Sequence, residues 1–111
     1  ILDNCNIQPY SKINNNVLVW GNSVIGHHSL IKKNSWITSG SNVGGNSIIG
    51  ENNFLGLNCT VGNMVEVGNN CFIGANSLIT RNIKKNSVII ENDTKLFKLS
   101  SSQFLNYTNF K

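Results

Sequence analysis

Aliphatic side chains recur at every sixth position along most of the chain. A step of six from Ile1 meets only Ile, Val or Leu until residue 79. The series runs through Ile7, Ile13, Val19, Ile25, Ile31, Ile37, Val43, Ile49, Leu55, Val61, Val67, Ile73 and Ile79. An α-helix repeats at about 3.6 residues and a simple strand at about two, so a sustained period of six matches neither element alone.

The positions between these aliphatics carry the same residue types in each repeat. A small side chain, often Ser, stands four residues after each aliphatic, Asn is common three residues after, and Gly is frequent one residue after. The small residue and the next aliphatic flank one outward residue, which predicts a short strand. Asn and Gly predict a tight corner, because they tolerate left-handed backbone angles. Three strands and three corners make one triangular coil, so we predict an all-β parallel β-helix of about five coils over residues 1–90.

The repeat changes phase once and then stops. After Ile79 the next aliphatics in phase with each other are Ile83 and Ile89. We therefore expect a short loop at residues 80–82. The repeat should end near Ile90, where no further aliphatic continues the period.

Residues 91–111 form a C-terminal extension with a different pattern. Several Phe, Leu and Tyr residues occur there without the period of six. We expect a short helix that is N-capped by Ser100 or Ser101 and runs to Phe110. Because the open end of a β-helix is an exposed strand edge, this extension is predicted to cap the last coil.

One outward column of the predicted β-helix is apolar on every coil. An apolar stripe of this length is too large to remain exposed to solvent on a soluble monomer, so we predict a subunit interface along it. A cover by the C-terminal extension is the alternative for the top of the stripe. The column consists of Leu18, Trp36, Phe54, Phe72 and Ile90.

Composition narrows the classes of partner. Charged residues are only 13% of the chain and the net charge is +4, without a basic stripe interleaved with aromatics, so nucleic acid is not an expected partner. No apolar run reaches the roughly 18 residues of a membrane span, and a cytoplasmic protein without a membrane partner is expected. The chain starts at Ile1 rather than Met, so we expect either a fragment or a processed form of the protein.

The cysteines and histidines do not predict a metal site. Cys5, Cys59 and Cys71 all occupy the inward small position, too far apart for disulfides, and are expected to be buried free thiols. The chain has two histidines, His27 and His28, and they are adjacent in sequence. A three-histidine zinc site of the β-helical carbonic anhydrase kind is therefore excluded, and no regular Thr ladder supports an ice-binding face.

A step of 18 residues from His27 defines one corner column that could carry chemistry. An imidazole suits proton removal near neutral pH, and a corner position lets it point into a cleft. Gly45 leaves its backbone N–H open to a ligand. His28 is expected to support the turn or to hydrogen-bond. The column continues through Asn63 and Arg81, and Arg81 is followed by the basic residues Lys84 and Lys85.

Two interpretations of Arg81, Lys84 and Lys85 remain open. They either bind the phosphates of a ligand that lies along the column, or they only solvate the end of the solenoid. For the histidine, the alternative to catalysis is a surface residue at a turn.

The stretch VIGHHS at residues 24–29, with NVGGNSIIGENNFLGLNCTV further on, resembles the sugar O-acyltransferases of the sialic acid O-acetyltransferase type. These are similar to the N-acetyltransferases of nucleotide-linked amino sugars. The resemblance covers residues 1–90 and implies a left-handed β-helix, homotrimers, and acetyl-CoA bound in the groove between subunits. It also implies that His27 is the general base and that the backbone N–H of Gly45 contacts the thioester carbonyl.

The expected function is therefore acetyl transfer from acetyl-CoA to an amine or hydroxyl of a sugar, in the synthesis of bacterial surface polysaccharide such as lipopolysaccharide. The cofactor-binding residues expected on this basis are Gly45, Asn63, Arg81, Lys84 and Lys85. A non-catalytic β-helical trimerisation or structural module is the alternative. The sequence leaves open the acceptor sugar and the choice between N- and O-acetylation.

Overall fold

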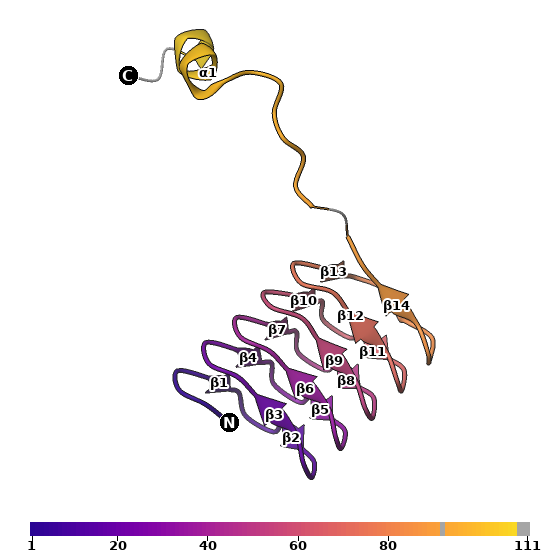
Figure 1. The fold of residues 1–111 in the computed structure, drawn as a ribbon. Helices are drawn as coiled ribbons and strands as arrows, with labels where there is room; N and C mark the ends of the chain where they lie inside the picture. The colour runs from indigo at the N-terminus through magenta and orange to yellow at the C-terminus, as the bar shows by residue number, and fades with distance from the viewer. Residues whose placement is uncertain (92, 109–111) are drawn as a thin grey trace.

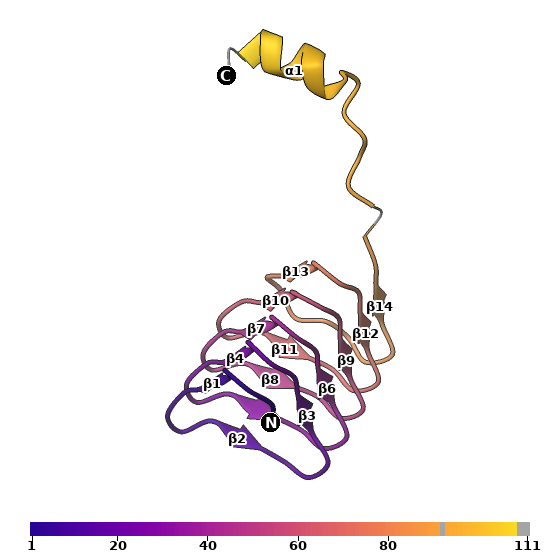
Figure 2. The same cartoon turned by 60° about the vertical axis from the view of Figure 1, so that its left-hand side comes forward.

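The computed structural model describes residues 1–91 and 93–108. Two-residue strands follow one another along the chain, and one short helix comes after the last strand. The strands fall into three parallel sheets, which form the three sides of a left-handed β-helix of about five coils. Figure 1 shows the coils stacked from the N-terminus upward, and Figure 2 shows their triangular outline. The predicted fold is confirmed.

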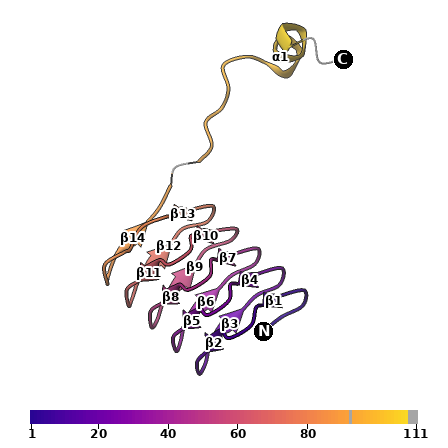
Figure 3. The same cartoon turned by 180° about the vertical axis from the view of Figure 1, so that it is seen from behind.

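Each sheet takes one strand from each coil, except that sheet B has no strand in the last coil. Sheet A contains β1 (Asn6–Ile7), β4 (Val24–Ile25), β7 (Asn42–Val43), β10 (Thr60–Val61) and β13 (Leu78–Ile79). Sheet B contains β2 (Lys12–Ile13), β5 (Leu30–Ile31), β8 (Ile48–Ile49) and β11 (Glu66–Val67). Sheet C contains β3 (Leu18–Val19), β6 (Trp36–Ile37), β9 (Phe54–Leu55), β12 (Phe72–Ile73) and β14 (Val88–Ile89). Figure 3 shows the stack from behind, with the strands of sheet A in chain order.

Three columns of corners join these sheets. The AB corner comprises residues 8–11, 26–29, 44–47, 62–65 and 80–82. The BC corner comprises residues 14–17, 32–35, 50–53, 68–71 and 84–87. The CA corner comprises residues 20–23, 38–41, 56–59 and 74–77. Equivalent residues of successive coils pair with each other, as Ile25 does with Val43, so each corner is a column of stacked turns.

The aliphatic series forms the core. From Val19 to Ile79 its members are at most 3% exposed, whereas Ile7 in the first coil is 36% exposed because no coil covers it from below. The small inward residues connect the coils by hydrogen bonds. Ser47 shows the pattern: its hydroxyl donates to the Gly62 carbonyl (2.7 Å) and accepts from the Val65 N–H (3.2 Å). Within the described residues, every buried side-chain nitrogen and oxygen has a partner.

Asn and Gly serve different purposes in the corners. Among the described residues, the left-handed angle falls only at the position of the repeated Asn, where φ is between 55° and 74°. Tyr10, His28, Gly40 and Met64 occupy this position in place of Asn. The Gly residues that directly follow β4 and β7–β12 do not adopt this angle, contrary to the expectation. Gly26 instead makes room for the next coil, because a Cβ there would lie 2.5 Å from the Gly45 nitrogen.

The phase change shortens the last AB corner. Only three residues separate Ile79 from Ile83, which pairs with Val67 on sheet B as an isolated bridge. The following strand is then shifted by two residues, so Phe72 pairs with Val88. The fifth member of the outward apolar column is therefore Val88, and the prediction of Ile90 is wrong.

The C-terminal helix forms where the sequence predicts it. The helix α1 (Ser101–Thr108) is capped by Ser100, whose hydroxyl accepts from the Gln103 N–H (3.3 Å) while the Gln103 side chain accepts from the Ser100 N–H (2.9 Å). The predicted end at Phe110 lies outside the described residues. The described residues do not show the predicted cap on the last coil: α1 lies away from the coils and buries none of its residues (Figure 1). The segment that precedes α1 has no strand period to hold it against the coils.

No helix in residues 1–91 and 93–108 is long and apolar enough to cross a membrane.

The three cysteines are free, as predicted. Cys59 and Cys71 are buried in the core, whereas Cys5 in the first coil is half-buried. Burial raises the pKa of the Cys59 thiol, and the hydrogen bond between Cys59 and Ser41 (3.5 Å) partly offsets this effect. The thiols therefore serve as small apolar residues of the core.

Candidate functional site

His27 lies on the AB corner of the second coil, between β4 and β5. Its backbone N–H donates to Oε1 of Gln8 in the coil below (3.1 Å). The side chain is exposed and extends toward the coil above, where a Cβ on Gly45 would lie 2.6 Å from Nε2 of the imidazole. The ring therefore rests against bare backbone, which it can do only because residue 45 has no side chain.

His28 is held by the first coil. Its φ of 58° is left-handed, its N–H donates to the Pro9 carbonyl (3.2 Å), and its ring stacks on Tyr10 with centroids 5.0 Å apart. The two imidazoles meet edge to face, and the Nδ1 atoms of His27 and His28 are 3.1 Å apart. Sequence reasoning missed Gln8 and Tyr10, although Tyr10 stands one coil, or 18 residues, before His28.

Gly45 is not free to bind a carbonyl as it stands. Its backbone N–H donates to Oδ1 of Asn63 on the coil above (2.9 Å). The sequence had placed Gly45 and Asn63 in one column, and the structure confirms that placement. An amide oxygen now occupies the position that a thioester oxygen would take, so such a ligand must displace the Asn63 side chain. The neighbouring pair Glu51 and Asn69 on the BC corner has the same arrangement (2.7 Å).

Two open hollows lie on either side of the histidine pair. The first, of about 440 Å³, lies over sheet A and is lined by His27 together with Asn42, Thr60 and Asn63. The second, of about 360 Å³, lies over sheet B. Its lining includes Tyr10, Lys12, His28, Leu30, Asn46 and Ile48. His27 thus faces one hollow and His28 the other.

The predicted basic cluster is divided between two corners. Arg81 stays on the AB corner above His27, but the shortened turn carries the chain across sheet B at Ile83 before Lys84 and Lys85. Both lysines therefore lie on the BC corner, where they line a hollow of about 540 Å³ together with Lys32. A ligand that touches both His27 and these lysines has to cross sheet B.

The apolar column of sheet C is a continuous aromatic stack. Trp20 and Trp36 are 6.3 Å apart, Trp36 and Phe54 are 6.3 Å apart, and Phe54 and Phe72 stack at 5.0 Å. Leu18, Trp36 and Phe72 each expose about two-fifths of their surface, at 39%, 43% and 44%. Nothing in the described chain covers this face.

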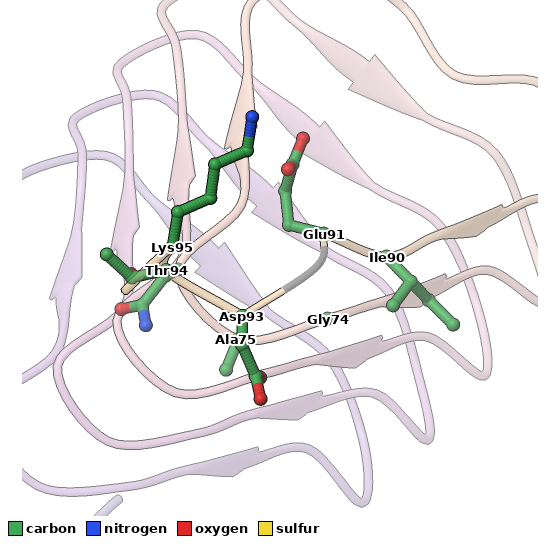
Figure 4. Close-up of a pocket in the computed structure, with 8 residues that line it drawn as sticks. Gly74, Ala75, Ile90, Glu91, Asp93, Thr94 and Lys95 are labelled. Carbon is green, nitrogen blue, oxygen red and sulfur yellow. The ribbon is translucent and has the colours of Figure 1, made fainter. Parts of the chain in front are cut away.

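Another hollow, of about 730 Å³, lies away from the histidines. The segment that leaves β14 bounds it against the CA corner at Gly74 and Ala75. In Figure 4 the side chains of Glu91 and Lys95 point out from one side of this segment and Asp93 points away from them. None of the described residues that line this hollow has an imidazole or a thiol, and the segment after β14 that bounds it pairs with no strand. We therefore place the candidate site at the histidines. No cluster of three His, Cys, Asp or Glu residues that could hold a metal occurs in the described part of the chain.

The family described as bacterial transferase hexapeptide (six repeats) matches residues 46–81. This match confirms the resemblance to hexapeptide-repeat transferases that the sequence indicated. No protein with a curated functional description matches the chain significantly.

Solved structures share the fold at low sequence identity. Serine acetyltransferase 1 from Entamoeba histolytica is 21% identical with a TM-score of 0.74, over 79% of this chain and 39% of its own. The acetyltransferase domain of PglB from Neisseria gonorrhoeae, in complex with acetyl coenzyme A, is 20% identical with a TM-score of 0.62, over 77% and 50%. PerB from Caulobacter crescentus, in complex with CoA and GDP-perosamine, is 18% identical with a TM-score of 0.50, over 77% and 50%. The matched region thus spans at most half the length of these proteins.

The contact between His27 and Gly45 predicts the effect of a methyl group. Gly45→Ala should push the His27 ring aside, since the new Cβ would lie 2.6 Å from Nε2, yet leave the fold intact because a side-chain end can move. Gly62→Ala on the same corner is the control, because its Cβ would meet only ordinary contacts, at 3.4 Å from the Ile79 carbonyl. Nuclear Overhauser contacts between the rings of His27 and His28 should weaken in Gly45→Ala alone. Equal spectra for the two variants would contradict the contact.

Proposed function

We propose that the chain is an acetyl-CoA-dependent acetyltransferase domain with His27 as its general base. The observation that carries the proposal is the exposed imidazole whose Nε2 lies against the bare backbone of Gly45 at the rim of an open hollow. The hexapeptide-repeat match and the acetyltransferases among the similar structures support it.

The chemistry needs a base at this position. A hydroxyl or amine becomes a strong nucleophile for a carbonyl carbon when its proton is removed as it attacks. His27 accepts this proton at Nε2, on the side of the hollow over sheet A, and returns it to the departing thiolate. Acetyl-CoA supplies the acetyl group as an activated thioester. The chain therefore acts through proton transfer and through positioning of the two substrates.

The residues around His27 fit a thioester. The Gly45 N–H already binds an oxygen, that of Asn63, and hydrogen bonds to a developing oxyanion are a common source of rate acceleration. When the Asn63 side chain rotates away, the same N–H becomes a donor for the thioester oxygen. This exchange replaces one oxygen acceptor by another and leaves no buried donor unpaired.

We propose a sugar as the acceptor, on a nucleotide carrier and in surface-polysaccharide synthesis in the cytoplasm. The VIGHHS stretch supports this class, and the PerB structure with CoA and GDP-perosamine is consistent with it. Serine is the second candidate, because the serine acetyltransferase shares the fold with a higher TM-score. A non-catalytic module is the third candidate. Thermal unfolding with acetyl-CoA distinguishes it, because a domain that binds acetyl-CoA unfolds at a higher temperature in its presence and a non-catalytic module that does not bind it shows no such shift.

Removal of the base should abolish most of the activity. We expect His27→Ala to lower kcat/KM by roughly 10²–10⁴-fold, the usual contribution of a general base. Release of free CoA thiol is measured with a panel of nucleotide-linked amino sugars and with serine, and mass spectrometry identifies the acetylated product. Circular dichroism checks that the variant is folded. Full activity in folded His27→Ala would refute the assignment of the base.

We propose that Lys84 and Lys85 bind the phosphates of CoA from the BC corner. Sheet B lies between them and His27, and its outward Leu30 and Ile48 offer apolar surface for the pantetheine arm. Lys32 lines the same hollow and adds a third positive charge, which the carboxylate of Glu66 partly offsets. Arg81 on the AB corner is the remaining predicted contact.

Charge reversal tests this path. Lys84→Glu/Lys85→Glu should raise the KM for acetyl-CoA and make it less sensitive to salt, because screened attraction to phosphate is lost. Lys95→Glu/Lys98→Glu is the matched control, since it makes the same change of charge on the segment after β14. If both double variants have the same KM for acetyl-CoA, the lysines of the BC corner do not bind the phosphates.

We propose a homotrimer that buries the aromatic stack of sheet C. Full removal of a large apolar side chain from water contributes about 1.5–3 kcal/mol, and burial of the two-fifths that Leu18, Trp36 and Phe72 still expose contributes the corresponding part of it. Sheet C is the side of the triangle opposite the AB corner. With this interface His27 points away from the neighbouring subunits, so each subunit would bind acetyl-CoA on its own AB corner, sheet B and BC corner. The groove between subunits that the resemblance implied for acetyl-CoA requires an interface on sheet A or B instead.

A charge in the middle of the stack separates the two arrangements. Phe54→Asp should convert the trimer to a monomer in sedimentation velocity, because a carboxylate between Trp36 and Phe72 cannot be buried without a partner. Leu78→Asp, on the exposed outer side of sheet A, is the control and should stay trimeric. The reverse result, a trimeric Phe54→Asp and a monomeric Leu78→Asp, would move the interface to sheet A and place His27 at the groove between subunits.

A further inference from the structure

The contact between His27 and His28 is a hydrogen bond, so one imidazole is its donor and the other its acceptor. Their Nδ1 atoms are 3.1 Å apart, a distance at which one nitrogen donates and the other accepts. A neutral imidazole carries its proton on either Nδ1 or Nε2, and the hydrogen bond at one nitrogen decides which. The pair can therefore exist in two forms, with either His27 or His28 as the donor.

Only one of these forms makes His27 a base. If His27 donates from Nδ1, its Nε2 holds a lone pair that faces the hollow over sheet A. If His28 donates instead, Nε2 of His27 carries the proton and cannot accept another from a substrate. The protonation state that catalysis needs thus depends on His28 acting as an acceptor at Nδ1.

His28 is the acceptor that the site offers. Among the described residues lining the two hollows beside the pair, none is a carboxylate. The titratable or charged side chains that face the pair are the phenol of Tyr10 and the ammonium of Lys12, and Lys12 cannot accept a hydrogen bond. The other neighbours of His27 are backbone at Gly45 and the amides of Gln8 and Asn63, which bind backbone N–H groups.

The first coil fixes the acceptor in place. The ring of Tyr10 stacks on that of His28 with an angle of 26° between the planes, and the Pro9 carbonyl binds the His28 N–H at 3.2 Å. The left-handed φ of 58° sets the direction in which the side chain leaves the backbone. Tyr10 and His28 both stand at the position that Asn usually fills, so the two rings stack because they occupy the same place in successive coils.

We propose that His28 is a positioning residue: as a neutral imidazole clamped by Tyr10, it accepts a hydrogen bond from Nδ1 of His27 and so holds the base with a free Nε2. This inference rests on the proposed function, in which His27 removes the proton from the acceptor. His28 touches no substrate in this role.

The tautomers are measured directly by two-bond ¹H–¹⁵N correlation spectra of protein labelled with ¹⁵N-histidine. At about pH 8, where ordinary imidazoles are neutral, His27 should carry its proton on Nδ1 and His28 on Nε2. This readout needs no acetyl acceptor. Protonation of His27 at Nε2 would overturn the inference.

Two substitutions at residue 28 separate the hydrogen bond from the fold. His28→Gly accepts the left-handed angle but removes the acceptor, so the proton of His27 should shift to Nε2. His28→Asn also suits the angle and places its amide oxygen at the same number of bonds from Cβ as Nδ1, so it should restore the Nδ1–H form. Tyr10→Asn removes the stacked ring, and should broaden the His28 signals and mix the tautomers of His27. An unchanged His27 tautomer in His28→Gly would overturn the inference.

Kinetics then connect the tautomer to catalysis. In His28→Gly we expect kcat to fall roughly 10–100-fold, less than the full ~10²–10⁴ contribution of the base, with little change in the KM for acetyl-CoA. His28→Asn should recover most of this loss. If the spectra follow the expected pattern but neither wild type nor variants transfer acetyl groups, the proposed function fails and the hydrogen-bonded pair stands. If transfer is robust but the rates do not follow the tautomer, the positioning role fails and the function stands.

Discussion

The backbone hydrogen bonds between successive coils are the interaction on which the rest of the structure depends. Each strand is only two residues long, so it is stable only when paired with strands of the coils below and above. Bonds such as that from the Gly26 N–H to the Val43 carbonyl (2.7 Å) recur at the equivalent place in the next coil, from Gly44 to Val61 (2.7 Å). These bonds form only when equivalent residues align. The alignment imposes one period on the coils and turns each position of the repeat into a column.

The corners are where this constraint leaves room for chemistry. Inward positions must be aliphatic or small, whereas a corner needs only one residue that accepts a left-handed angle and one that lets the next coil approach. His28 meets the first requirement at φ 58°, and the neighbouring His27 needs no special angle. The stacking that aligns the strands also sets Tyr10 beneath His28 and Gly45 above His27. The regular fold therefore positions an irregular pair of side chains without a dedicated loop.

The one irregularity of the repeat redirects the end of the solenoid. A corner with three residues between Ile79 and Ile83 still allows the bridge to Val67, so the stack continues through it. Every later residue is displaced by two places, which moves Val88 onto the apolar face and the lysines after Ile83 onto the BC corner. A small change in corner length thus decides which surface carries the basic charge, while Ile83 and Ile89 still pack against the core.

The sequence by itself determined the coil, its period, the buried aliphatics, the inward cysteines and the column that contains His27, Gly45 and Asn63. It could do so because the repeat of six residues is a local pattern that is present in every coil. Only the tertiary structure decided what the side chains of that column do. The Asn63 side chain accepts a hydrogen bond from the Gly45 N–H, and Nδ1 of His28 lies against Nδ1 of His27. These contacts depend on atoms of neighbouring coils, so the residue types alone do not predict them. The same reason explains α1: its cap is local and was predicted, but its place depends on contacts between an aperiodic segment and the last coil, which no period encodes.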